Sequence, residues 1–152
     1  MTTPRISIVI PLYNKAASVT RSLRSVFAQG CPDVEILVID DGSTDGGDEV
    51  VRGIADRRIR LIRQENRGVS AARNRGIAEA AADWVAFLDA DDEWLPGFLE
   101  TIFGLRSQFP DCDVFATAYF YCLPDGQVRH QCRGAGNFPH HNGGRFHRGM
   151  GA

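Results

Sequence analysis

The sequence predicts an α/β fold in which a mostly parallel β-sheet carries helices on both faces. Two observations predict it. Short runs rich in β-branched and aromatic residues recur along the chain, and segments with helical spacing of apolar residues lie between them. Strands that alternate with helices form right-handed βαβ units, in which the strands are parallel. At 152 residues the chain is near the usual size of a single domain.

The expected strands are residues 5–10, 34–40, 58–63, 84–89 and 113–122. Apolar residues at helical spacing predict helices near residues 19–27 and 98–109, and Pro96 suits the first turn of the second helix. Residues 69–82 are Ala-rich. Alanine favours a helix, and its thin side-chain layer lets the helix backbone approach a sheet closely.

Composition changes near residue 124. Residues 1–123 are expected to form the α/β domain, whereas residues 124–152 are rich in Gly, His and Arg and poor in aliphatic residues. Such a tail cannot bury much of its own surface. The letters LPDG predict a tight turn and one short strand after it, followed by loop or disorder.

Charge and hydropathy limit the partners. The net charge is −2 and 43% of the residues are apolar, so the sequence has no electrostatic footprint for nucleic acid. We find neither a signal peptide nor a stretch of the ~20 apolar residues that a membrane span needs. The protein is therefore expected in the cytoplasm, either free or peripheral to the inner face of the membrane.

Ligands of parallel α/β sheets bind in the crevice beyond the carboxyl ends of the strands. The first four expected strands end in PLYN, DDGSTD, QENRG and DADD. Polar, acidic and Gly-bearing segments should therefore gather at one edge of the sheet, and this edge is the candidate site.

Asp40 and Asp41 end the second expected strand. One interpretation is a helix-capping turn in which Ser43 or Thr44 is the N-cap. The other is that at least one carboxylate faces the crevice and needs a hydrogen-bond donor, such as a ligand imide or a ribose hydroxyl. The second interpretation is favoured for Asp41, and the two are balanced for Asp40.

Four carboxylates lie within residues 89–93, with no Lys or Arg between them. Clustered carboxylates repel one another unless a cation or solvent relieves them. Asp89 and Asp91 are separated by one residue at a strand end, so they should project in a similar direction. Together they could bind Mn²⁺ or Mg²⁺, with the remaining positions taken by water and diphosphate oxygens. The positive charge would then arrive with the substrate. A solvated acidic turn is the other interpretation, and it is preferred for Asp92 and Glu93.

Two further side chains are candidates. Arg73 lies among small residues near the start of the Ala-rich helix, so it should pack against a neighbour, and a phosphate contact suits it there. Arg67 and Arg75 are expected on a solvated face. Tyr13, at the end of the first strand, could stack on a flat ring or pack at the rim of the site.

The ordered segments SIVIPLYN, EILVIDDGSTD, QENRGVSAARNRGI and WVAFLDADDEWLPG resemble the family 2 glycosyltransferases of GT-A fold. The resemblance covers about residues 5–110. It implies a Rossmann-like half-domain that binds a nucleotide-sugar, most often a UDP-sugar. The family's reaction is a metal-assisted, inverting transfer of the sugar to an acceptor hydroxyl on a glycan, lipid or protein.

The resemblance also assigns roles by position. Pro11 and Tyr13 would line the base pocket, Asp41 would hydrogen-bond the base edge, and Arg73 would lie by the base or the diphosphate. Asp89, Ala90 and Asp91 form the family's DxD motif. Asp91 would be the direct metal ligand, and Asp89 would lie nearer the ribose or a metal-bound water.

The family usually continues with strands that carry the acceptor site and a general base, so the sequence looks like a truncated N-terminal half. We identify no general base, which leaves a non-catalytic nucleotide-diphosphate-binding module as the alternative function. Self-association is expected if an apolar face of residues 113–122 is uncovered. A haloacid-dehalogenase-like phosphatase would also use a D-x-D strand end, but it needs a hydroxyl residue where Glu93 stands and a lysine later than Lys15.

Overall fold

The structure is a computed structural model that describes residues 3–117, 120–122 and 128–130. The chain divides into two compact units, residues 1–100 and 101–152. The first unit contains the sheet and all the site residues expected from the sequence. The boundary expected after residue 123 stays a prediction.

The first unit is built on four parallel strands. They are β1 (Ile6–Leu12), β2 (Val34–Asp40), β3 (Ile59–Arg63) and β4 (Val85–Phe87). Their spatial order is β3-β2-β1-β4, and every neighbouring pair is parallel. The predicted α/β class with a mostly parallel sheet is therefore confirmed.

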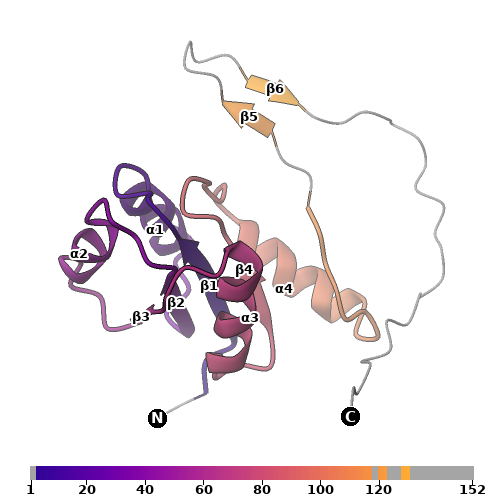
Figure 1. Ribbon diagram of the computed structural model, residues 1–152. Coiled ribbons are helices and arrows are strands. Elements are labelled where there is room, and N and C mark those ends of the chain that lie inside the picture. The colour runs from indigo at the N-terminus through magenta and orange to yellow at the C-terminus, as the bar shows by residue number, and fades with distance from the viewer. Residues whose placement is uncertain (1–2, 118–119, 123–127, 131–152) are drawn as a thin grey trace. The chain divides into compact units, whose positions relative to one another are not determined.

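The connections place helices on both faces of this sheet. β1 leads to β2 through α1 (Val19–Phe27), and β2 leads to β3 through α2 (Gly47–Arg52). The connection through α3 (Val69–Glu79) runs back across the sheet from β3 to β4. Because parallel crossovers are right-handed, α1 and α2 lie on one face and α3 lies on the other, as Figure 1 shows.

The core beneath α3 is packed very closely. Val9, Leu37 and Ile39 are fully buried together with Ala72 of α3. A Cβ added to Gly76 would lie 2.7 Å from Cγ2 of Val9 and closer still to Cγ1, so the backbone of α3 rests directly on β1. The close approach expected of the Ala-rich helix is confirmed.

Pro11 marks the point where the sheet opens. In β1, Ser7 and Val9 bond toward β4, since Ser7 N donates to Trp84 O and Leu88 N donates to Val9 O. Pro11 points its missing N–H to the same side, because bonding direction alternates along a strand. β4 ends at Phe87, the partner of Val9. The pairing of β1 with β4 therefore stops before the end of β1, at the place where the strand order reverses and where ligands of parallel α/β sheets bind.

Several expected element ends are wrong. The N-cap of α2 is Gly46, with a φ of 81°, and not Ser43 or Thr44. The last predicted helix begins at Phe98 and leaves Pro96 outside it, because Gly97 has a φ of 81° and interrupts the turn. The helix expected over 69–82 ends at Glu79. Beyond it, the N–H groups of Ala81 and Ala82 bond to side chains of β2 and β1.

In the second unit the prediction was only partly correct. α4 (Phe98–Gln108) leads into it, and β5 (Phe120–Cys122) pairs antiparallel with β6 (Val128–His130). The expected strand 113–122 is wrong over 113–117, because those residues are not in a strand. β6 lies where one short strand was expected in the tail, while residues 131–152 fall outside the described part of the chain. Self-association through this segment stays a prediction.

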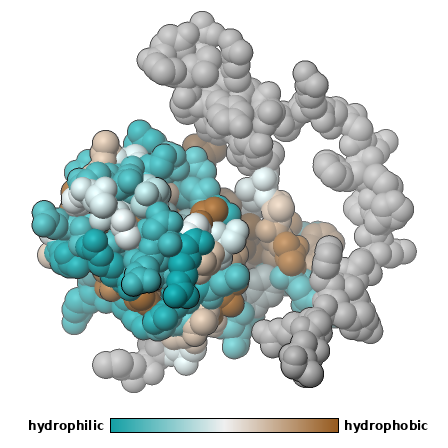
Figure 2. Space-filling view, viewed as in Figure 1, coloured by the Kyte–Doolittle hydropathy of each residue, from teal (hydrophilic) through white to brown (hydrophobic). Residues whose placement is uncertain are grey.

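The surface of the first unit is mostly hydrophilic on the face turned to the viewer in Figure 2. Among the described residues, no helix has both the length and the apolar character needed to cross a membrane.

Asp56 gives a pH-dependent contribution to stability. Its carboxylate pairs with Arg58 at 2.6 Å, and this hydrogen bond holds the pKa of Asp56 below its ordinary value. A carboxyl with a depressed folded pKa stabilises the fold above its unfolded pKa of roughly 3.9 and loses that contribution as pH falls through the folded value. At pH 7, Asp56→Asn should therefore lower the free energy of unfolding by about 1–2 kcal/mol.

Urea denaturation of the wild type and Asp56→Asn between pH 7 and pH 3 measures this difference. The difference in the free energy of unfolding between the two proteins should become steadily smaller below about pH 4. A difference that stays constant over this range would contradict the assignment. Asp111→Asn, an exposed carboxyl in the second unit, is the control.

Candidate functional site

The four loops beyond the carboxyl ends of the strands are joined by side-chain contacts into a ring, which we call the carboxyl-edge ring. The loop after β1 contacts the loop after β2 and the loop after β4. The loop after β2 also contacts the loop after β3 and the start of α3. α3 then reaches the loop after β4. The segments predicted to gather at one edge of the sheet therefore do so.

The β1 and β2 loops are joined through Asn14. Its Oδ1 accepts a hydrogen bond from Thr44 N at 2.9 Å, and its own N donates to Ser43 Oγ at 3.1 Å. Next to it, Ala16 N donates to Asp45 Oδ2 at 2.8 Å. Asn14 has a φ of 52°, the left-handed conformation that asparagine tolerates better than most residues. These contacts fix the turn that carries Tyr13 and Lys15.

Asp41 holds the loop after β3. It is 2% exposed, and its carboxylate accepts hydrogen bonds from Gln64 Nε2 at 2.8 Å, Arg67 N at 2.9 Å and Gly68 N at 2.8 Å. The last two donors stand at the start of α3, where the helix dipole favours a negative charge. The expectation that Asp41 needs a donor from a ligand is thus corrected, because the chain supplies three. Its contact with a nucleotide base stays a prediction.

Asp40 is fully buried beside Asp41. Its Oδ1 accepts Ser43 N at 2.9 Å, and Arg63 Nε lies 3.4 Å from its Oδ2. Arg63 also binds Asp48 Oδ2 at 2.9 Å and Ser43 O at 3.1 Å. The chain therefore supplies Arg63 as the counterion of Asp40, and a ligand-binding role for Asp40 stays a prediction.

Arg73 reaches across from α3 to the acidic segment after β4. Its Nη2 lies 2.6 Å from Asp89 Oδ1, and its Nε is buried. The expectation that Arg73 packs against a neighbour is confirmed. Arg75 instead forms an exposed i,i+4 pair with Glu79, in agreement with the solvated face predicted for it.

Asp91 meets Lys15, the one lysine of the sequence. Lys15 Nζ lies 2.6 Å from Asp91 Oδ2, and this hydrogen bond raises the pKa of Lys15. Arg21 Nε pairs with Glu93 at 2.7 Å. The acidic segment therefore already has cations from the turn after β1, from α1 and from α3. The expectation that its positive charge arrives only with a substrate was wrong, because sequence distance hid these partners.

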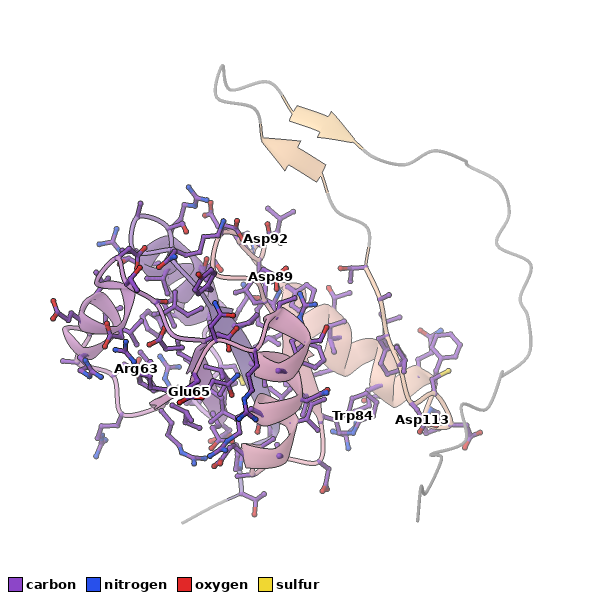
Figure 3. The ribbon with its side chains drawn as sticks, in the orientation of Figure 1. Arg63, Glu65, Trp84, Asp89, Asp92 and Asp113 are labelled. Carbon is purple, nitrogen blue, oxygen red and sulfur yellow. The ribbon has the colours of Figure 1, made fainter. Side chains whose placement is uncertain are left out.

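The DxD residues also differ from the predicted geometry. β4 ends at Phe87, so Asp89, Ala90 and Asp91 lie in a turn, with Asp92 N bonded to Asp89 O. Asp89 and Asp91 face different cations, and the expected shared strand direction does not apply. Figure 3 shows Asp89 and Asp92 close together, with Trp84 well away from them. Partial burial and the charges of Asp91 and Asp89 raise the pKa of Asp92.

The remaining candidates flank this ring. Tyr13 is 49% exposed at the end of β1, whereas Pro11 is buried within the strand. Two shallow pockets lie beside the loop that Asp41 holds. The residues that line them are Gly42, Arg63, Gln64, Glu65, Arg67 and Arg75. These pockets offer polar groups and a flat shape rather than a deep apolar cavity.

The donor set fits a divalent ion only in company with a ligand. In the part of the chain that is described, no three His, Cys, Asp or Glu side chains are grouped to hold a metal by themselves. Asp89 and Asp91 are 42% and 47% exposed at their side chains, so both can accept a further partner. Two carboxylates with open positions suit a Mg²⁺ or Mn²⁺ that shares its coordination with phosphate oxygens.

Sequence comparison decides the family. The family model described as glycosyl transferase family 2 matches residues 7–148. The chain belongs to glycosyltransferase family 2. This membership replaces the phosphatase alternative, and it agrees with the resemblance seen in the ordered motifs.

Curated relatives carry related names. The chain is 40% identical over 123 residues to the uncharacterised glycosyltransferase YibD of Escherichia coli K12. The matched region covers 80% of this chain and 36% of YibD. The chain is 33% identical over 121 residues to the glycosyltransferase EpsH of Bacillus subtilis 168, named as putative, covering 78% and 35%. The chain thus spans about a third of the length of these relatives.

Solved structures show the same fold. The Staphylococcus aureus TarS 1–349 complex with UDP-GlcNAc matches with a TM-score of 0.65 at 25% identity, covering 70% of this chain and 32% of that one. The Pyrobaculum calidifontis mannosyltransferase PcManGT, in complex with GDP-Man and Mn²⁺, matches with a TM-score of 0.53 at 30% identity, covering 62% and 29%. The Rossmann-like GT-A assignment of the first unit is confirmed.

Several residues of the ring escaped sequence reasoning. Lys15, Asn14 and Gln64 were not proposed, although Lys15 lies in the turn after the first strand and is the one lysine of the sequence. Its position could have identified it as a candidate. Asn14 and Gln64 gave no signal beyond lying in the right loops.

Proposed function

We propose that this family 2 chain supplies the donor-binding part of a glycosyltransferase. Its ligand would be a nucleoside-diphosphate sugar, with a UDP-sugar as the first candidate, bound together with Mn²⁺ or Mg²⁺. The complete reaction would transfer the sugar, with inversion, to a hydroxyl of a glycan, lipid or protein. One observation carries the proposal: Asp89 and Asp91, which follow β4, pair with Arg73 of α3 and with Lys15 in the turn after β1.

The charges of these four side chains suit a diphosphate and a metal bound together. Asp91 and Asp89 offer the carboxylate oxygens that a divalent ion prefers. Arg73 and Lys15 offer donors for phosphate oxygens, Arg73 with a planar fork and Lys15 as a point charge. Each cation neutralises one carboxylate until a ligand arrives, which keeps the acidic segment stable in the free protein.

Asp91 and Asp89 would hold the metal, with Asp91 as the direct ligand. The bound ion would supply Lewis-acid stabilisation of the negative charge that develops on the departing nucleoside diphosphate. Tyr13, exposed at the end of β1, would stack on the base. Asp41 would support the base pocket by fixing the loop after β3, and Ala90 would allow the donor to approach the DxD turn.

The test is calorimetric titration of the full chain with UDP, GDP and dTDP, with and without Mn²⁺. UDP should bind more tightly with Mn²⁺ than without it. Asp91→Asn should remove this Mn²⁺-dependent gain, since it keeps the side-chain shape and removes the charge that binds the ion. Asp111→Asn, an exposed carboxylate in the second unit, is the matched control and should keep the gain.

Three outcomes separate the possibilities. Wild-type protein that binds none of the three nucleotides with Mn²⁺ would overturn the proposal. Preference for GDP or dTDP would change the nucleotide and keep the site. Metal-dependent binding without hydrolysis or transfer of a donor sugar would identify the chain as a nucleotide-diphosphate-binding module, the alternative that the unidentified general base leaves open.

A further inference from the structure

Polar side chains on one side of α1 and in the turns next to its two ends bind the segment after β4. Ser18, Arg21, Ser25 and Gln29 follow at intervals of three and four residues, a spacing that places them along one face of a helix. We call these four residues the α1 polar stripe. The segment they bind, residues 90–99, begins inside the DxD motif.

The first half of the stripe binds the motif itself. Ser18 Oγ donates to Ala90 O at 2.8 Å, and Arg21 Nη2 donates to Asp91 O at 2.9 Å. Arg21 also pairs through Nε with Glu93 Oε1 at 2.7 Å. The two carbonyls next to the proposed metal ligand are therefore held by α1.

The second half of the stripe binds the rest of the segment. Ser25 Oγ accepts Trp94 N at 3.0 Å. Gln29 uses both ends of its amide, since Nε2 donates to Leu95 O at 3.0 Å and Oε1 accepts Leu99 N at 3.2 Å.

The sheet does not provide this support. The last bond between the β4 region and β1 joins Leu88 N to Val9 O. Residues 88–97 are neither strand nor helix. The described hydrogen bonds that position the backbone of residues 90–95 against the rest of the first unit thus come from side chains of the α1 polar stripe.

We propose that the α1 polar stripe consists of positioning residues that hold Asp91 where it can share a divalent ion with Asp89. This inference rests on the proposed function and deepens it. Asp89, Asp91 and Asp92 lie within four consecutive residues, and carboxylates held so close together repel one another. A turn without strand pairing would relax by moving these carboxylates apart. Groups that orient metal ligands commonly change metal affinity by about 10- to 100-fold when they are removed.

Ser18→Ala and Arg21→Ala test the stripe at its two contacts with the motif. Thr20→Ala and Arg24→Ala are matched controls on the same helix. They remove a hydroxyl and a positive charge from side chains that make no hydrogen bond to residues 90–99 among those described. UDP affinity is measured by calorimetry with and without Mn²⁺, together with the melting temperature and the hydrogen exchange of the amides of residues 91–95.

Ser18→Ala and Arg21→Ala should each weaken Mn²⁺-dependent UDP binding by about threefold to tenfold, the equivalent of one or two lost hydrogen bonds. Metal-free UDP binding should stay unchanged, and exchange in residues 91–95 should become faster. The direction of the change in Mn²⁺-dependent UDP affinity is more informative for Arg21→Ala than for Ser18→Ala. Removal of the positive charge of Arg21, which lies beside carboxylates, should by itself strengthen cation binding, so a weaker affinity of Arg21→Ala reports lost positioning. Ser18→Thr keeps the hydroxyl and should restore the affinity.

A purely structural role would lower the melting temperature and weaken UDP binding equally with and without Mn²⁺, and this result would overturn the inference. Unchanged exchange of the amides of residues 91–95 in both variants would also overturn it. If the wild type shows no Mn²⁺-dependent binding while both variants accelerate this exchange, the proposed function fails, and the stripe retains only its role in ordering the segment.

Discussion

Gly76→Ala should destabilise the first unit by about 1–3 kcal/mol. A helix interior normally gains up to about 1 kcal/mol from this change, because alanine has the higher helix propensity. Here the added methyl group would meet both γ-carbons of Val9, which is fully buried in the centre of the sheet. Overpacking should outweigh propensity, since neither β1 nor α3 can shift without breaking other contacts.

Urea denaturation followed by circular dichroism measures the effect of Gly76→Ala. Gly104→Ala is the control, because a Cβ at Gly104 meets nothing within 4 Å and only the gain in propensity remains. If Gly76→Ala fails to fold, the double variant Val9→Ala with Gly76→Ala keeps the argument testable. It should recover stability relative to Gly76→Ala, because truncation of Val9 makes room for the new methyl group. Equal stability of Gly76→Ala and the wild type would refute the close packing of α3 on β1.

The second large effect is expected at Asp41. Asp41→Asn should lower the free energy of unfolding by about 2–3 kcal/mol, since a hydrogen bond to a charged group contributes about 1.5–3 kcal/mol. The amide keeps the shape of the carboxylate, but its NH₂ group would face N–H donors where Oδ1 and Oδ2 now accept from Arg67 N and Gly68 N. One of these partly buried hydrogen bonds would be lost, and the start of α3 would lose its negative charge.

Glu65→Gln is the matched control for Asp41→Asn. It removes a carboxylate from the loop that Asp41 holds, but Glu65 is exposed, so its stability should change by less than about 0.5 kcal/mol. Denaturant titration of both variants and the wild type measures these changes in the free energy of unfolding. A wild-type midpoint for Asp41→Asn would show that Asp41 does not hold the loop. Nucleotide affinity of Asp41→Asn should be measured only under conditions where the variant is folded, so that a role toward the base is separated from the role in the fold.

Prediction from sequence was most accurate where local patterns decide the structure. β1 and β2 were predicted to within two residues at each end, because their continuous apolar runs are buried on both faces of a parallel sheet. β3 was predicted as closely from its β-branched residues, although it is an edge strand and only partly buried. Predicted ends were less accurate where tertiary partners compete with propensity. Ala81 and Ala82 are good helix formers, yet their N–H groups bond to Glu35 and Ser7, and α3 stops before them.

The sequence by itself determined that acidic and Gly-bearing loops gather at one edge of a parallel sheet, since strand direction and right-handed crossovers leave no other arrangement. Only the tertiary structure decided how those loops are joined. Lys15 and Asp91 are 76 residues apart, and Arg21 and Asp91 are 70 apart. Charge pairing depends on distance in space and not on local pattern, so no periodicity predicts it. For the same reason Asp40 and Asp41, adjacent in sequence, have different partners: side chains alternate at a strand end, and the fold supplies Arg63 to one and the start of α3 to the other.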